Sequence, residues 1–257
     1  MTNFYLTKPT LFMLLALALF SGCGTSVQSV KNSSRFDGLM KKAQAYLDRG
    51  NPQMALVALT KAEKMQPANV DMLTNLGVAY DQLGQAGKAL PVWRKAHALK
   101  PKSGAINHNL GVALMRKQLL VEAKQAFLDA LADPKFDDRS ETYYNLALIQ
   151  QRRGAVKEMV SGLNHVLQID SNHLPAHQVL AGYYRKMRRP DLEERHLRNI
   201  LGIDPKSVAT LERLAELYQQ AGKRTLAKKL LQRIGIVAPE SPAAKRAEVK
   251  LGEYLNQ

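Results

Sequence analysis

The sequence is poor in the residues that most often lock a fold or carry chemistry. Its 257 residues include one cysteine, one tryptophan and 6% aromatic residues. A lone cysteine indicates a free thiol or an intermolecular bridge, unless it is modified. The apolar run near the N-terminus, residues 11–20, has only ten residues. That run is too short to span a bilayer and fits the core of a signal peptide.

Sequence motifs typical of enzymes are also missing. The chain has no P-loop, no GxSxG and no HExxH sequence. Only His173 and His177 have the spacing of a helical ligand pair, and Pro175 between them argues against a metal site. We therefore predict no enzymatic activity, no cofactor and no metal.

Acidic residues are few, 22 against 37 lysines and arginines, which gives a net charge of +15. Basic residues cluster at 185–189, 223–224, 228–229 and 245–246. Such a surface is either simply solvated or attracts anionic lipid headgroups or an acidic partner. The few aromatic residues offer little stacking surface for bases, so we expect no nucleic-acid partner.

What the chain does contain is a repeated pattern, clearest in the stretch that begins at Leu73. Leu73, Leu76 and Tyr80 recur at i, i+3 and i+7, which predicts one apolar helix face. Gly77 leaves an open spot on that face, where a second helix carrying Trp93 can come close. The pattern predicts two packed helices joined by a short turn.

Six such units follow one another at a spacing of 34 residues, lengthened to 36 at one joint. They begin at Phe36, Val70, Gly104, Ser140, Leu174 and Val208. The pattern resembles the tetratricopeptide (TPR) repeat, a helix–turn–helix unit of about 34 residues. The resemblance implies an all-α TPR solenoid, a right-handed superhelix of about six repeats plus a C-terminal capping helix. We predict repeats at 36–69, 70–103, 104–139, 140–173, 174–207 and 208–239, and the capping helix at 240–257.

The N-terminal segment ends in Leu19-Phe20-Ser21-Gly22-Cys23, which resembles a bacterial lipobox. The resemblance implies a signal peptide at 1–22 and lipidation of Cys23 with a diacylglyceryl group and a further acyl chain, such as palmitate. Gly24 after the cysteine implies sorting to the periplasmic face of the outer membrane. Residues 23–35 are polar and small, so we expect a flexible tether. Cleavage with secretion, or retention of the segment as an anchor, are the alternatives.

A narrower resemblance rests on the irregular joint at 132–140 and on the helix that follows it, which contains the motif Tyr144-Asn145-Leu146-Ala147-Leu148. Type IV pilus pilotins of the PilF/PilW type combine a similar joint with a lipobox and six repeats. The resemblance implies a non-enzymatic, monomeric assembly factor that helps an outer-membrane secretin subunit localise and multimerise. The alternatives are a periplasmic adaptor that docks peptidoglycan enzymes and an accessory lipoprotein of a Flp (tight-adherence) pilus.

The TPR resemblance also implies a concave groove lined by the first helix of each repeat. In the second to fourth repeats the groove positions hold Thr74, Asn75, Val78, His108, Asn109, Val112, Met115, Arg116, Tyr144, Asn145, Leu148 and Arg152. We predict an apolar floor, asparagine amides that bind an extended peptide backbone, and arginines that bind an acidic flank or a C-terminal carboxylate. Alternatively, the asparagines serve packing between repeats.

Overall fold

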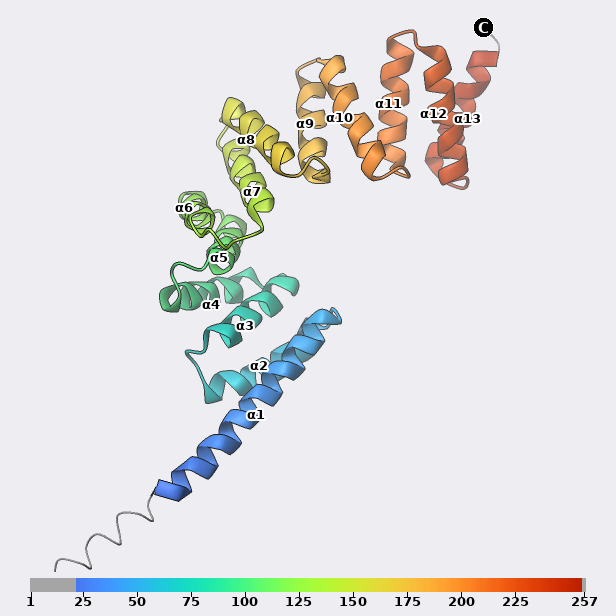
Figure 1. The fold of residues 1–257 in the computed structure, drawn as a ribbon. Coiled ribbons are helices and arrows are strands. Elements are labelled where there is room, and N and C mark those ends of the chain that lie inside the picture. Colours follow the sequence, from blue (N-terminus) through green and yellow to red (C-terminus); the bar gives the residue numbers. More distant parts are fainter. Residues whose placement is uncertain (1–21, 256–257) are drawn as a thin grey trace, which may run out of the picture. The chain divides into compact units, whose positions relative to one another are not determined.

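The computed structural model describes residues 22–255, with side chains from 29 to 253, and every element in that range is a helix (Figure 1). The helices are α1 (Gly22–Asp48), α2 (Pro52–Met65), α3 (Val70–Gln82), α4 (Ala86–Leu99), α5 (Gly104–Arg116), α6 (Leu120–Leu131), α7 (Arg139–Arg152), α8 (Val156–Ile169), α9 (Leu174–Lys186), α10 (Pro190–Ile203), α11 (Val208–Gln220), α12 (Arg224–Val237) and α13 (Pro242–Leu255). They form six helix hairpins and one further helix. The predicted all-α repeat architecture is confirmed.

The chain folds as two compact units that divide after Phe136. The first unit contains α1 to α6, and the second contains α7 to α13. Each hairpin from α3/α4 to α11/α12 lies within one predicted repeat, apart from α7, which begins at Arg139, one residue before the predicted start.

The N-terminal end of the first unit differs from the prediction. We expected a flexible tether up to Arg35, but α1 runs without a break from Gly22 to Asp48. No proline and no glycine lies between Gly24 and Gly38, so nothing in the sequence stops the helix from extending backwards. Residues 29–35 are exposed, and Phe36 is the first buried residue among those whose side chains are described. Residues 1–21 of the predicted signal peptide and the side chain of Cys23 lie outside the described part of the chain.

All six hairpins turn in the same way. In the second repeat, the Gln85 N–H donates to the Tyr80 carbonyl (2.9 Å) and the Gly84 N–H donates to the Asp81 carbonyl (3.0 Å). This pair of bonds is the Schellman arrangement, which needs a left-handed residue at Gly84, and φ there is +68°. Gln118 and Arg188 adopt the same conformation in the third and fifth repeats, with φ of 61° and 53°. The turn is therefore kept even where a side chain makes it costly, by roughly 1–2 kcal/mol.

In two hairpins of the first unit, α3/α4 and α5/α6, a glycine on the first helix faces an aromatic ring on the second helix. A Cβ atom on Gly77 would lie 2.5 Å from Trp93, and one on Gly111 would lie 2.6 Å from Phe127. Both rings are fully buried. The contact fixes how closely α3 approaches α4 and how closely α5 approaches α6.

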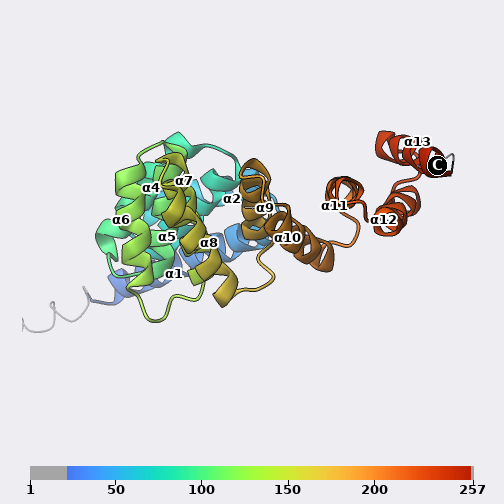
Figure 2. The ribbon, with the colours of Figure 1, turned by 90° about the horizontal axis from the view of Figure 1, so that it is seen from above.

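The second unit ends in a helix that covers its last apolar face. Ala243, Ala244 and Ala247 of α13 pack against Leu231 and Ile234 of α12, and α13 lies beside α12 in both Figure 1 and Figure 2. The Ala244 N–H donates to the Ser241 hydroxyl (3.1 Å), so Ser241 caps the helix as its sequence context indicates. None of the described helices is both long and apolar enough to cross a membrane.

Replacing Gly77 with alanine is expected to lower the free energy of unfolding by about 1–3 kcal/mol, because the buried Trp93 ring cannot move away from the new methyl group. Gly87→Ala in α4 is the matched control, since nothing lies within 4 Å of a Cβ atom there. Its effect should stay within about 0.5 kcal/mol. Urea unfolding followed by Trp93 fluorescence measures both, and equal effects would contradict the close-approach argument.

Candidate protein-binding surface

The twelve predicted groove residues lie on three helices and fall into both units. The first unit carries eight of them on α3 and α5, and the second carries four on α7. Most are half-buried, which leaves part of each side chain accessible to a partner. Met115 departs from this pattern, because only 9% of it is exposed. The Met115 side chain packs beneath the other groove residues and exposes little surface area to a ligand.

The asparagines of the first unit are not equivalent. The Asn109 amide donates to the Ala105 carbonyl one turn earlier (3.0 Å), and the Thr74 hydroxyl donates to the Val70 carbonyl (2.9 Å). In both side chains, a hydrogen-bond donor is therefore already used within the residue's own helix and is not available to a ligand. Asn75 forms no side-chain hydrogen bond with any part of the chain that the structure describes. Its amide keeps the full donor and acceptor capacity that a peptide backbone requires.

His108 is held by aromatic packing. Its ring centroid lies 5.7 Å from that of Phe127 and 5.7 Å from that of Phe136. Phe136 belongs to the joint after α6, and its side chain is 6% exposed. A hydrogen bond also holds the joint against α5, because the Gly104 N–H donates to the Asp133 carboxylate (2.8 Å). The backbone N–H groups of Gly104 and Lys135 hold the pKa of Asp133 below its usual value. The joint is irregular between α6 and α7, and Phe136 is its one buried residue.

Arg116 is not the free cationic end of the groove that we expected. Its guanidinium donates to the Asp81 carboxylate (2.6 Å), whose other oxygen accepts the Trp93 indole N–H (2.7 Å). Burial raises the pKa of Asp81 above its usual value, although the bonds from Trp93 and Arg116 act in the opposite direction. The carboxylate neutralises much of the arginine's charge and links three successive helices, α3, α4 and α5.

In the second unit, one of the residues predicted on α7, Tyr144, lies beside a histidine. The Tyr144 and His173 ring centroids are 5.0 Å apart, and burial, followed by the nearby Glu141, raises the pKa of Tyr144. Asn145 and Leu148 are half-buried, and Arg152 is exposed. Asn145, like Asn75, makes no side-chain hydrogen bond within the described residues.

Sequence reasoning missed a set of buried polar residues in the second unit. Glu193, 3% exposed, receives two hydrogen bonds from Arg213, at 2.6 and 3.0 Å. These bonds raise the pKa of Arg213, while its partial burial acts in the opposite direction. The signal was present in the sequence, because four of the six repeats have alanine at the place that Glu193 occupies.

The two histidines that the sequence singled out have structural roles. His173 accepts the Ala176 N–H (3.2 Å) and so caps α9. His177 lies against His196 of α10, with their Nδ1 atoms 2.9 Å apart. Within the described residues, no group of three metal-ligating side chains comes together.

Comparison with known proteins assigns the repeat type. Family models described as tetratricopeptide repeat match residues 40–103 and residues 194–251. The chain is a TPR protein. The predicted TPR fold is therefore confirmed.

The TPR chain resembles proteins of type IV pilus assembly. It is 30% identical over 149 residues to the type IV pilus assembly protein PilF of Pseudomonas aeruginosa. That match covers 55% of this chain and 58% of PilF, so it spans less than two thirds of the relative's length. An uncharacterized protein of Haemophilus influenzae is 27% identical over 153 residues, covering 59% of this chain and 86% of that protein.

Solved structures show the same fold. The structure of Pseudomonas aeruginosa PilF superposes with a TM-score of 0.68 at 20% identity, covering 86% of this chain and 99% of that one. The structure of PilW, a type IV pilus biogenesis factor, gives 0.68 at 20% identity, covering 82% and 97% of the two chains. At these identities the likeness concerns the fold, and the confirmed resemblance is that of a TPR protein to PilF and PilW.

The Asp81 contacts generate a stability prediction. Asp81→Ala leaves the buried indole N–H of Trp93 without an acceptor and is expected to lower the free energy of unfolding by about 1–3 kcal/mol. Arg116→Ala removes only a half-exposed ion pair and should cost less than about 1 kcal/mol. Asp81→Asn keeps an acceptor oxygen and should fall between them. Urea unfolding followed by Trp93 fluorescence ranks the three variants, and an Arg116→Ala loss as large as that of Asp81→Ala would refute the ranking.

Proposed function

We propose that this protein is a non-enzymatic, lipid-anchored assembly factor of a type IV pilus, a pilotin that captures a segment of an outer-membrane secretin subunit. The observation that carries the proposal is the similarity to PilF, at 30% identity over 149 residues, together with a fold shared over most of both chains. PilW, which has the same fold, is a type IV pilus biogenesis factor by its description. TPR folds bind protein partners in a groove, which suits a scaffold better than a catalyst.

The surface on α3 offers what such capture needs. Asn75 presents an uncommitted amide, and the half-buried Val78 lies one turn further along the same helix. An amide flanked by apolar area holds an extended backbone and one apolar side chain at the same time. Asn145 and Leu148 repeat this combination on α7 in the second unit.

Lipidation of Cys23 completes the mechanism that we propose. Several acyl chains anchor a protein stably, whereas a single chain gives only marginal binding. An anchored groove on the periplasmic face of the outer membrane would meet secretin subunits where they insert. Confinement to one surface raises the effective concentration of the partner without any additional contact.

The decisive experiment places a photo-crosslinking amino acid at Asn75 and identifies the product from isolated outer membranes by mass spectrometry. Asn75 is preferable to His108, which packs between Phe127 and Phe136. We expect a secretin subunit at Asn75 and none at Lys95, an exposed residue of α4 that serves as the control. A murein hydrolase or synthase at Asn75 would instead indicate an adaptor for peptidoglycan enzymes, and a Flp-pilus component would indicate that system.

The anchor has its own test. Cys23→Ser is expected to abolish incorporation of an alkyne-labelled palmitate and to move the protein from the outer-membrane fraction to the soluble periplasm, because the thioether cannot form. Ser26→Ala, three residues further on, is the control and should keep both the label and the location. If the wild-type protein incorporates no labelled palmitate, lipidation is not part of the mechanism.

A further inference from the structure

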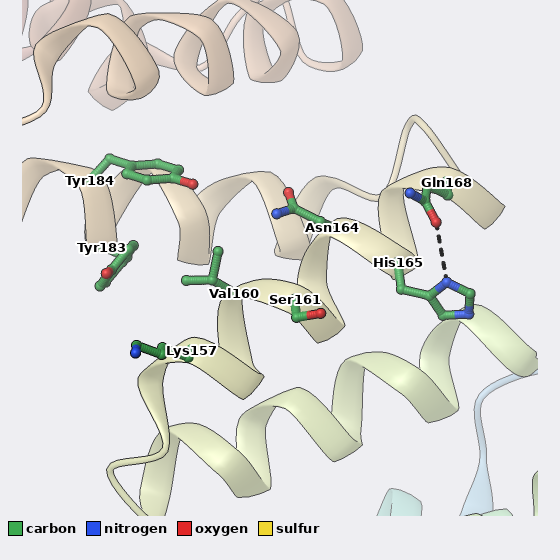
Figure 3. Close-up of a pocket in the computed structure, with 8 residues that line it drawn as sticks. All are labelled: Lys157, Val160, Ser161, Asn164, His165, Gln168, Tyr183 and Tyr184. Atoms are coloured by element: carbon green, nitrogen blue, oxygen red, sulfur yellow. Dashed lines mark hydrogen bonds between the residues drawn. The ribbon is translucent and has the colours of Figure 1, made fainter.

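Three helices of the second unit, α8, α9 and α10, line two adjoining hollows that are open to solvent and have no part in the surface described above. Their volumes are about 650 and 580 Å³, and both are lined by Asn164 and Gln168 of α8 and by Tyr184 of α9. Figure 3 shows the α8 side chains along one side of the first hollow, with Tyr183 and Tyr184 facing them. We call the two hollows together the α8–α10 groove. None of the twelve predicted groove residues lines it.

The groove exists because α8 packs loosely on α9. These helices contact one another less extensively than α2 contacts α3, α4 contacts α5 or α10 contacts α11. The α8 face that lines the groove carries Ser161, Asn164 and Gln168. Such short or polar side chains leave space that an apolar side chain would have filled.

A chain of hydrogen bonds in the floor leaves one acceptor open. His177 Nε2 lies 3.0 Å from the Ser171 carbonyl, which can only accept, so this nitrogen carries a hydrogen. With a neutral ring, His177 Nδ1 must then accept from His196 Nδ1, which lies 2.9 Å away. A neutral His196 therefore has its hydrogen on Nδ1, and its Nε2 keeps a lone pair. His196 lines the groove, and its Nε2 has no hydrogen-bond partner among the described residues.

The surroundings of His196 keep that lone pair available. Burial lowers the pKa of His196 to about 4, and the adjacent His177 and Arg195 add to the effect. The Tyr184 ring stacks on the His196 ring, with centroids 5.6 Å apart and planes 10° from parallel. The imidazole is thus neutral at neutral pH and fixed in orientation.

The remaining polar groups of the groove suit a chain with alternating donors and acceptors. Asn164, Gln168 and Asn199 supply amides, each of which can donate and accept. Lys157 and Arg195 add two cations that form no ion pair within the described part of the chain, and no carboxylate lines either hollow. The groove is therefore complementary to a negatively charged ligand.

We propose that the α8–α10 groove is a second binding site, which takes an extended peptide segment of about five residues carrying an acidic side chain or a free C-terminal carboxylate. Lys157 and Gln168 are eleven positions apart on α8, about 17 Å along a helix. At about 3.3 Å per residue, that distance accommodates five residues of extended chain. Peptide N–H groups donate to His196 Nε2, the amides pair with the backbone, and Lys157 or Arg195 binds the carboxylate.

A saccharide fits the same residues less well. Sugar hydroxyls are donors as much as acceptors, and a site for them needs acceptors to match. In this groove Lys157 and Arg195 can only donate, and neither finds an opposite charge on a neutral sugar. The charge of the lining favours a carboxylate-bearing peptide.

The test uses the full-length protein in detergent and a synthetic library of fluorescein-labelled pentapeptides with free C-termini. We expect the selected peptides to be rich in Asp or Glu, or to lose binding when the C-terminus is amidated. Arg195→Ala, and separately the double variant Asn164→Ala with Gln168→Ala, should weaken binding about tenfold or more. These side chains are exposed, so the fold should tolerate their removal. Arg198→Ala is the matched control, because Arg198 lies on α10 but outside the groove, and binding should not change.

Three results would overturn the proposal. Selected peptides without acidic residues or carboxylate dependence would remove the charge argument. Equal loss of binding in the Arg195→Ala and Arg198→Ala variants would show non-specific attraction to a basic surface. Displacement of the peptide by an N-acetylglucosamine tetramer would assign the groove to a glycan. None of these results bears on the secretin test, which uses a crosslinker at Asn75 on α3.

A spectroscopic measurement tests the floor directly. Long-range nitrogen–proton NMR at pH 8 distinguishes a protonated ring nitrogen from a bare one. We expect a bare Nε2 on His196, and its signal should shift when the selected peptide is added but stay in place with a sequence-scrambled peptide that does not bind. A protonated Nε2, or no shift, would remove His196 from the site.

Discussion

The close approach of the two helices in each hairpin is the constraint on which the rest of the structure depends. It needs one small and one large side chain facing each other, Gly77 with Trp93 in the second repeat and Gly111 with Phe127 in the third. In the fourth repeat the small residue is Ala147, which lies in one buried cluster with the large side chain of Leu163 on α8. Because a small and a large residue hold the two helices of each hairpin together, the opposite face of the first helix is not needed for this packing. That face can vary in sequence, which is why it can serve as a binding surface.

The six Schellman turns show the same independence of one repeat from another. Four of them use glycine, but Gln118 and Arg188 adopt the left-handed conformation as well. A side chain there costs roughly 1–2 kcal/mol, which the packing of a whole hairpin can offset. Glycine at this place thus contributes to stability and does not decide the fold. The small and large pair does decide it, since overpacking would separate the two helices along their length.

The repeats and the capping helix could be predicted because their causes are local. Periodic apolar residues, alanines in the second helices and the left-handed turns all lie within about 34 residues of one another. Polar contacts between repeats could not be predicted in this way. The Arg116–Asp81 bond joins residues 35 positions apart, and it depends on how one hairpin is placed on the next. The helical extension of α1 was missed for a different reason, since a polar composition suggests a tether although no residue in it breaks a helix.

The two units differ in what they bury between helices, and this difference indicates where binding has developed. Among the described residues, the first unit buries one polar side chain, Asn107, whereas the second buries six, with Glu193, His177 and His196 among them. Buried polar groups stabilise a fold poorly unless each is paired, and pairing fixes their geometry. Glu193 is paired with Arg213, and His177 is held by Ser171 and His196. After these bonds, His196 Nε2 is the ring nitrogen of this histidine pair that has no partner within the described residues, and His196 lines the α8–α10 groove. A neutral ring nitrogen that is held rigidly at the wall of a hollow can accept a hydrogen bond from a ligand without any rearrangement of the protein.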